Sequence, residues 1–165
     1  MAKMKTRALR QQLPAPAARL AALLACAWLA FAPLAYAQQA EPAYQPRTGD
    51  AWLDRHLADI NLYAARYPQS FADEISRYYS VPRDYVEAMQ QQPSWEAGDI
   101  FMACALAQAL AQPCRAVVRE WSHDHSEGWK GVSRRLQSGP GPVLQRKLRN
   151  DVEQSYSRWA RPLKK

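Results

Sequence analysis

Apolar residues recur at intervals of three and four along most of the chain after residue 50, as they do on one face of an α-helix. The spacing is clearest in a central run, Ile100, Phe101, Cys104, Leu106, Ala107 and Leu110, and in a final run, Leu144, Leu148, Val152, Tyr156 and Trp159. The chain shows no strand-like alternation of apolar and polar residues and no internal repeat. The sequence therefore predicts an all-α fold.

Prolines and capping residues divide this pattern into about six or seven short helices. Asp50 can cap a first helix that Pro68 ends, and Ser70 with Asp73 can open a second. Pro82 suits the first turn of a third helix, because proline lacks the amide proton that this position leaves unused. Later helices are expected over about 98–111, after Pro113, over 129–136 and from Leu144 to Trp159. We expect these helices to form a compact orthogonal bundle.

The central helices form a helix-turn-helix-like pair, since Pro113 interrupts the apolar run and Val117, Val118 and Trp121 resume it. Cys104 precedes the turn and Cys114 follows it, so a chain reversal there would bring the two cysteines together. We expect a disulfide between them in an oxidising compartment. The alternative is a pair of small, buried thiols.

The N-terminus has the layout of a secretory signal peptide over residues 1–37. Five basic residues and no acidic one precede the apolar stretch Leu20–Leu34, and Ala35-Tyr36-Ala37 offers a signal-peptidase site. The sequence thus predicts a periplasmic protein without a stable membrane span once the signal is removed. Two alternatives stay open: a lipoprotein anchored at Cys26, and a retained single-span anchor.

The rest of the chain divides into three parts. Residues 38–49 contain prolines and lack apolar periodicity, which predicts a disordered tether. Residues 50–160 form a single helical domain, and residues 161–165 form a basic tail.

The signal peptide also changes the charge balance. The whole chain has 22 basic and 15 acidic residues, a net charge of +7. Without residues 1–37 the balance is 17 basic against 15 acidic residues, or +2, so the high isoelectric point does not indicate a nucleic-acid partner. The remaining positive charge lies in the C-terminal half, and the candidate residues for an anionic partner are Arg134, Arg135, Arg146, Lys147 and Arg149.

The loop after Trp121 contains the chain's one His-x-His pattern. His123, His125 and Glu127 have the donor types that zinc or copper prefers, and Asp124 offers another carboxylate. A polar loop without a metal explains the same residues, because no second pair of ligands is apparent.

Five tyrosines cluster between the first and third predicted helices: Tyr63, Tyr67, Tyr78, Tyr79 and Tyr85. Tyrosines at this spacing form either the edge of a core or a surface on which sugar rings stack. No serine-hydrolase elbow, zinc-protease motif or phosphate-binding loop occurs anywhere in the chain. We therefore expect a protein that is not an enzyme.

One longer pattern runs through the middle of the chain. It consists of Trp95-x-x-Gly98-Asp99-Ile100-Phe101-x-Ala103-Cys104-Ala105-Leu106-Ala107, then Pro113-Cys114-x-x-Val117-Val118, then His125-x-x-Gly128-Trp129. This pattern resembles a group of small exported helical proteins of Gram-negative bacteria. The resemblance implies an exported location and a helical fold, and it implies no activity, cofactor or site residue.

These observations predict a non-enzymatic periplasmic protein. Its basic C-terminal half would contact an anionic envelope component or protein partner. The alternative function is metal binding by the loop from His123 to Glu127. No cofactor is expected under the first hypothesis, and zinc or copper under the second.

Overall fold

The computed structural model describes residues 43–136, 141–161 and 163, and all regular structure in these ranges is helical. The helices are α1 (Ala51–Arg66), α2 (Pro68–Tyr79), α3 (Arg83–Gln90), α4 (Ala97–Ala109), α5 (Cys114–His123), α6 (Gly128–Arg135) and α7 (Pro142–Arg158). The predicted all-α fold is confirmed, with seven helices in the described part of the chain. The signal-peptide and lipoprotein predictions concern residues 1–37, which lie outside these ranges.

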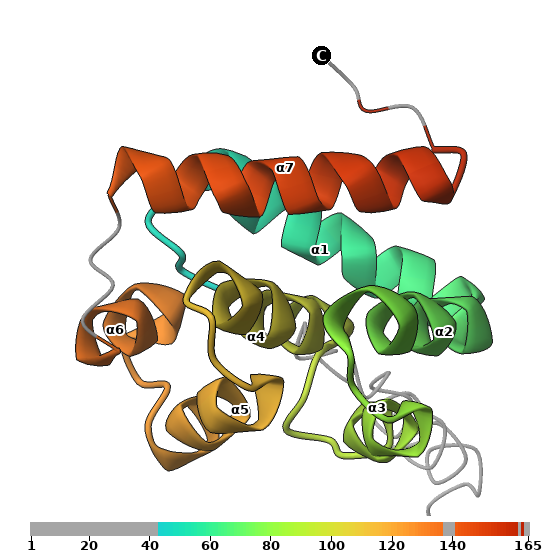
Figure 1. The fold of residues 1–165 in the computed structure, drawn as a ribbon, viewed down its shortest axis with the longest axis horizontal. Coiled ribbons are helices and arrows are strands. Elements are labelled where there is room, and N and C mark those ends of the chain that lie inside the picture. The colour runs from blue at the N-terminus through green and yellow to red at the C-terminus, as the bar shows by residue number, and fades with distance from the viewer. Residues whose placement is uncertain (1–42, 137–140, 162, 164–165) are drawn as a thin grey trace, which may run out of the picture. The chain divides into compact units, whose positions relative to one another are not determined.

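Helix α4 forms the centre of the bundle (Figure 1), in contact with α1, α2, α3, α5 and α7. Every residue from Gly98 to Ala107 is buried. A helix that is apolar on all sides needs neighbours on all sides, so the other helices surround it. Gly98 lets α1 approach α4 closely, because a Cβ there would lie 2.6 Å from the carbonyl oxygen of Leu57 in α1.

Helix α1 is capped as predicted and is joined to the last helix at the same point. Asp50 Oδ1 accepts hydrogen bonds from the backbone amides of Trp52 and Leu53, at 2.9 and 3.3 Å. The same buried carboxylate accepts from Nε and Nη2 of Arg149, both at 2.8 Å. Asp50 therefore fixes both the start of α1 and the position of α7. Figure 1 shows α7 running across α1.

Two features of the N-terminal half differ from the sequence expectation. Helix α2 begins at Pro68 and not at Ser70, because proline fits the first turn and leaves only Tyr67 between α1 and α2. The second difference concerns the segment 43–49, expected to be a disordered tether. The backbone amides of Trp129 and Lys130 donate to the carbonyls of Pro46 and Arg47, both at 2.9 Å, so this segment lies against the start of α6.

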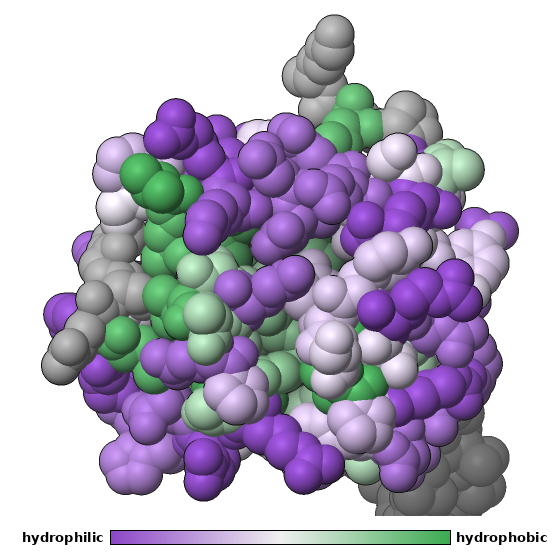
Figure 2. Space-filling model, in the orientation of Figure 1, coloured by the Kyte–Doolittle hydropathy of each residue, from purple (hydrophilic) through white to green (hydrophobic). Residues whose placement is uncertain are grey.

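None of the helices in the described ranges is long and apolar enough to cross a membrane. On the face in Figure 2, hydrophilic side chains cover most of the surface and hydrophobic ones appear in smaller patches. Four large hydrophobic side chains of the described residues are strongly exposed: Leu62, Tyr67, Tyr78 and Val143.

Candidate functional site

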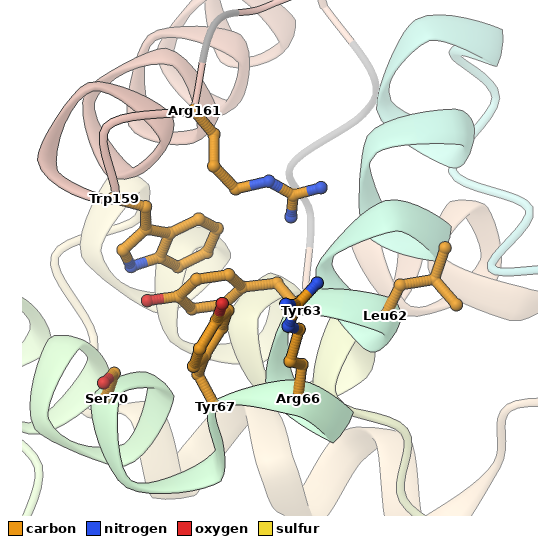
Figure 3. A pocket seen from close by; sticks show the side chains of 7 residues that line it. All are labelled: Leu62, Tyr63, Arg66, Tyr67, Ser70, Trp159 and Arg161. Carbon is orange, nitrogen blue, oxygen red and sulfur yellow. The ribbon is translucent and has the colours of Figure 1, made fainter.

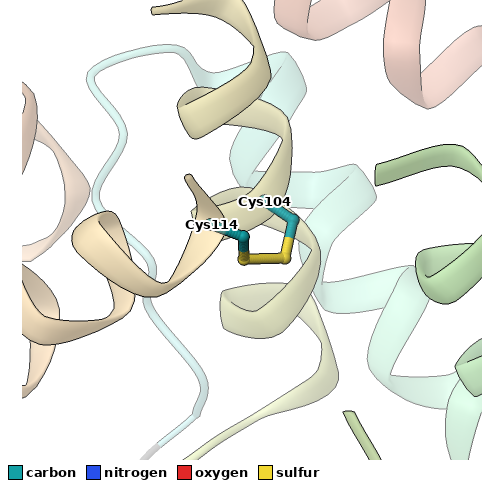
Figure 4. The surroundings of a disulfide bond; sticks show 2 residues. All are labelled: Cys104 and Cys114. Carbon is teal, nitrogen blue, oxygen red and sulfur yellow. A yellow bond between two sulfur atoms is a disulfide. The ribbon is translucent and has the colours of Figure 1, made fainter. Parts of the chain in front are cut away.

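The predicted cysteine pair is joined in the structure. Cys104 in α4 and Cys114 at the start of α5 have their sulfur atoms 2.05 Å apart and their Cα atoms 4.6 Å apart (Figure 4). Both residues are buried. The bond links the two helices of the central pair across the turn at Pro113, so its role in the structure is to hold this pair together.

Two of the three candidate metal ligands, His125 and Glu127, are engaged in other contacts, and the third, His123, is exposed. The ring of His125 stacks on Trp121, and its Nδ1 lies 3.0 Å from the Trp121 carbonyl oxygen. Glu127 forms an ion pair with Arg134. Within the described residues no group of three histidine, cysteine, aspartate or glutamate side chains is arranged to hold a metal. Zinc or copper binding by His123, His125 and Glu127 stays a prediction.

Three of the five candidate anion-binding residues pair with acidic side chains of the protein itself. Arg134 pairs with Glu127, Arg135 with Glu120 and Asp124, and Arg149 with the buried Asp50. Arg146 and Lys147 are exposed on α7 and form no ion pair with a described residue, although Lys147 lies close enough to Asp151 to lower the pKa of that carboxyl. The structure therefore leaves two of these five charges unpaired.

A groove that we call the aromatic groove lies between α1, α2 and the C-terminal end of α7 (Figure 3). It has two adjoining parts, each of about 520 Å³, which share Tyr63, Ser70 and Trp159. The first part is also lined by Leu62, Arg66, Tyr67 and Arg161, and the second by Asp73, Glu74, Arg77, Tyr78 and Arg158. The groove collects tyrosines from the predicted cluster and places them beside arginines from distant parts of the chain.

Two stacked rings form the inner wall of the groove. Tyr63 of α1 and Trp159 lie with ring centroids 4.0 Å apart and planes 17° apart. Tyr67 adds a tilted ring at 5.3 Å from Tyr63. Burial raises the pKa of the Tyr63 hydroxyl, although its hydrogen bond with Ser70 lowers it.

Four arginines surround these rings, and they differ in how far the protein neutralises them. Arg158 Nε donates to the buried Glu74 at 2.7 Å, and Arg161 Nη2 donates to Asp59 at 3.0 Å. Arg66 lies over the Tyr67 ring, with 5.4 Å between its Cζ and the ring centroid, and it forms no ion pair with a described residue. Arg77 likewise has no acidic partner in the described part. The groove thus has two uncompensated positive charges.

Two hydrogen-bond donors in the same groove lack an acceptor among the described residues. They are Trp159 Nε1 and Arg161 Nη1, and both atoms are shielded from solvent. A buried donor without an acceptor is costly, and a third such donor in the described residues, Trp121 Nε1, lies outside the groove. The groove therefore combines positive charge, aromatic surface and unsatisfied donors.

A buried carboxylate, Asp99, lies elsewhere in the core. Its Oδ1 accepts from Trp129 Nε1 at 2.7 Å and from the Tyr44 hydroxyl at 2.8 Å. Burial raises the pKa of Asp99 to about 6 and outweighs these two hydrogen bonds, which lower it. Asp99 is buried and does not line the aromatic groove, so we assign it a structural role: it joins α4, α6 and the segment before α1.

Sequence reasoning identified some residues of the aromatic groove and missed others. Tyr63, Tyr67 and Tyr78 belong to the tyrosine cluster noted above, and Trp159 belongs to the apolar run of the last helix. Arg66 and Arg77 were not singled out. The signal that marks them is a repeated Arg-Tyr pair, since each arginine directly precedes an exposed tyrosine.

No family model, curated protein or solved structure matches this chain.

Proposed function

We propose that the protein is an exported, non-enzymatic binding domain that takes an anionic group of an envelope component or protein partner in the aromatic groove. The observation that supports this proposal is the pair of unpaired arginines, Arg66 and Arg77, beside an aromatic wall. Guanidinium groups bind carboxylate and phosphate oxygens through two parallel hydrogen bonds, and they also stack on aromatic rings. A groove with both features suits an anionic ligand.

We prefer the groove as the binding face to the basic residues of α6 and α7. Of those residues only Arg146 and Lys147 form no ion pair with a described residue, and neither lines the groove. Arg134, Arg135 and Arg149 would have to give up intramolecular ion pairs before they bound another anion. Arg66 and Arg77 would not. Arg158 and Arg161 still bring the basic C-terminal half into the site, because both line the groove.

Calorimetric titration with inorganic polyphosphate, a polyanion without rings, tests the binding part of the proposal. We expect binding that weakens steeply with added salt, because screening acts on exposed charges. The variant Arg66→Ala/Arg77→Ala should lose about tenfold or more in affinity, since each charge-assisted hydrogen bond contributes about 1.5–3 kcal/mol. Equal binding by this variant and the wild type would contradict the proposal.

The matched control is Arg55→Ala/Arg119→Ala. It also removes two positive charges, but from exposed arginines that line neither part of the groove. We expect its affinity to change by about threefold or less, as for loss of long-range attraction alone. An equal loss in both double variants would show that net charge governs binding and that the groove has no special role.

Intact mass spectrometry of the protein from its native envelope fraction tests export. The expected mass begins at Gln38 and is two hydrogen atoms lighter than the reduced chain. A mass that begins at a lipidated Cys26 would make the protein a membrane-tethered lipoprotein. A cytosolic protein with the signal retained and the thiols reduced would contradict export.

A further inference from the structure

We infer that the ligand of the aromatic groove is an acidic glycan, bound lengthwise along α2 with its sugar rings on Tyr67 and Tyr78 and its acidic groups on Arg66 and Arg77. This inference rests on the proposed function, because it specifies the chemistry of the anionic ligand at the same site. It is drawn from the exposure, spacing and charge of the residues along the groove.

Exposure is the first argument. Of the four strongly exposed large hydrophobic side chains in the described residues, Leu62, Tyr67 and Tyr78 line the groove and only Val143 does not. Tyr67 is 45% exposed and Tyr78 is 41% exposed. Aromatic rings kept in water on a small domain tend to be contact surfaces for a partner. The apolar face of a sugar ring is a partner of matching shape, and the tyrosine hydroxyls can bond its hydroxyl groups.

Spacing is the second argument. Tyr67 and Tyr78 lie at opposite ends of α2, eleven positions apart, which corresponds to about 16 Å at the α-helical rise per residue. The two parts of the groove lie between them and meet at Tyr63, Ser70 and Trp159. A single small anion would occupy only one end. A chain of several units can reach both exposed rings.

Charge is the third argument. A guanidinium lies over each exposed ring: Arg66 over Tyr67, and Arg158, which pairs with Glu74, over Tyr78 at 3.8 Å. Arg77, which forms no ion pair with a described residue, lines the same part of the groove as Tyr78. A polymer with an acidic group on each ring repeats the complementary features in the same way. The exposed side chains of Ser70 and Asp73 between the two ends offer a donor and acceptors that suit sugar hydroxyls. An acidic peptide would use the arginines but has no ring faces for the tyrosines.

Binding measurements with three probes test the inference on the full mature protein. The probes are oligogalacturonate, poly-L-glutamate of matched charge and a neutral maltooligosaccharide. We expect oligogalacturonate to bind about tenfold or more tightly than poly-L-glutamate, through ring contacts that the peptide lacks. The neutral sugar should bind far more weakly than either polyanion, because it lacks the ion pairs.

Two double variants separate the ring contacts from charge. Tyr67→Ala/Tyr78→Ala should lose about tenfold in affinity for oligogalacturonate and should change binding of poly-L-glutamate by about twofold or less. Tyr67→Phe/Tyr78→Phe keeps both rings and should keep most of the affinity for the acidic sugar. Both tyrosines are exposed, and circular dichroism of each variant checks that the fold is intact.

The outcomes distinguish this inference from the proposed function. Equal binding of both polyanions, unchanged in Tyr67→Ala/Tyr78→Ala, would overturn the acidic-glycan assignment and leave anion binding in place. Tighter binding of poly-L-glutamate would point to an acidic protein partner and would also overturn the assignment. No binding of either polyanion would overturn both.

Discussion

The buried carboxylate Asp99 should make the stability of the domain depend on pH in a direction opposite to that of most aspartates. Asp99 has a pKa raised from 3.8 to about 6, and burial is the largest cause. A raised pKa means that the folded state binds the proton more tightly than the unfolded state does. The stabilisation is therefore complete below about pH 4 and is lost as the pH rises through about 6.

The size of the effect follows from the shift. Each pKa unit corresponds to about 1.4 kcal/mol, so the rise from 3.8 to about 6 amounts to about 3 kcal/mol of stability lost by pH 7.5. Only 4% of Asp99 is exposed, so solvent screens this contribution little. For a domain of this size about 3 kcal/mol is a substantial share of the total free energy of unfolding.

The variant Asp99→Asn tests this reasoning, because asparagine cannot ionise and its side-chain oxygen can still accept from Tyr44 and Trp129. Urea unfolding followed by tryptophan fluorescence at pH values from 4 to 8 gives the free energy of unfolding. We expect the wild type to lose about 2 kcal/mol more than the variant does between pH 4.5 and 7.5, because about 1 kcal/mol of the total is already lost at pH 4.5, above the unfolded-state pKa of 3.8. The comparison removes the contributions of all other titrating groups, which the two proteins share.

Asp151 provides the control. Burial raises its pKa to about 6 as well, although the nearby Arg158 and Lys147 lower it. It is only half-buried on α7, so its effect on stability should be smaller. Asp151→Asn should therefore flatten the pH profile less than Asp99→Asn.

The reasoning is refuted if Asp99→Asn shows the same pH dependence as the wild type, because Asp99 would then ionise in the folded protein as it does in water.

Three further changes test the packing of the fold. Gly98→Ala should cost about 1–3 kcal/mol in urea unfolding, because its Cβ would lie 2.6 Å from a backbone oxygen of α1. Replacing both Cys104 and Cys114 by alanine should lower the free energy of unfolding by about 3 kcal/mol, because the disulfide closes a loop with a sequence separation of 10. A reductant should then have no further effect on unfolding. Arg149→Ala should lower the free energy of unfolding by about 1–2 kcal/mol, because it leaves the buried carboxylate of Asp50 without its cation. The control Arg146→Ala should change it by less than about 0.5 kcal/mol. Equal effects of the two arginine variants would contradict the assigned roles.

Local signals in the sequence predicted the helices and the disulfide well. The apolar runs, Pro113 and the cap at Asp50 act within a few residues of one another, so their effect can be read from spacing alone. The start of α2 was harder to predict from the sequence, because Pro68 is compatible both with ending one helix and with starting the next. The structure uses it for the second role.

Contacts between distant segments were not predictable in the same way. Segment 43–49 lacks periodicity and therefore resembled a tether, but its order comes from hydrogen bonds to Trp129 and Lys130, more than 80 positions later. The pairing of Arg149 with Asp50 likewise spans 99 positions. Such contacts determine which basic side chains form intramolecular ion pairs. For this reason the arginines that the structure leaves unpaired in the groove are not the basic residues that the sequence favoured.

The measurement that tests the central claim most directly is the indole N–H resonance of Trp159 during titration with polyphosphate. Trp159 Nε1 lies in the groove without an acceptor, whereas Trp129 Nε1 donates to the buried Asp99 and serves as an internal reference. Binding in the aromatic groove predicts a saturable shift of the Trp159 resonance and an unchanged Trp129 resonance. An unchanged Trp159 resonance, with shifts confined to the backbone amides of Arg146 and Lys147, would place the anion on the outer face of α7 and contradict the account.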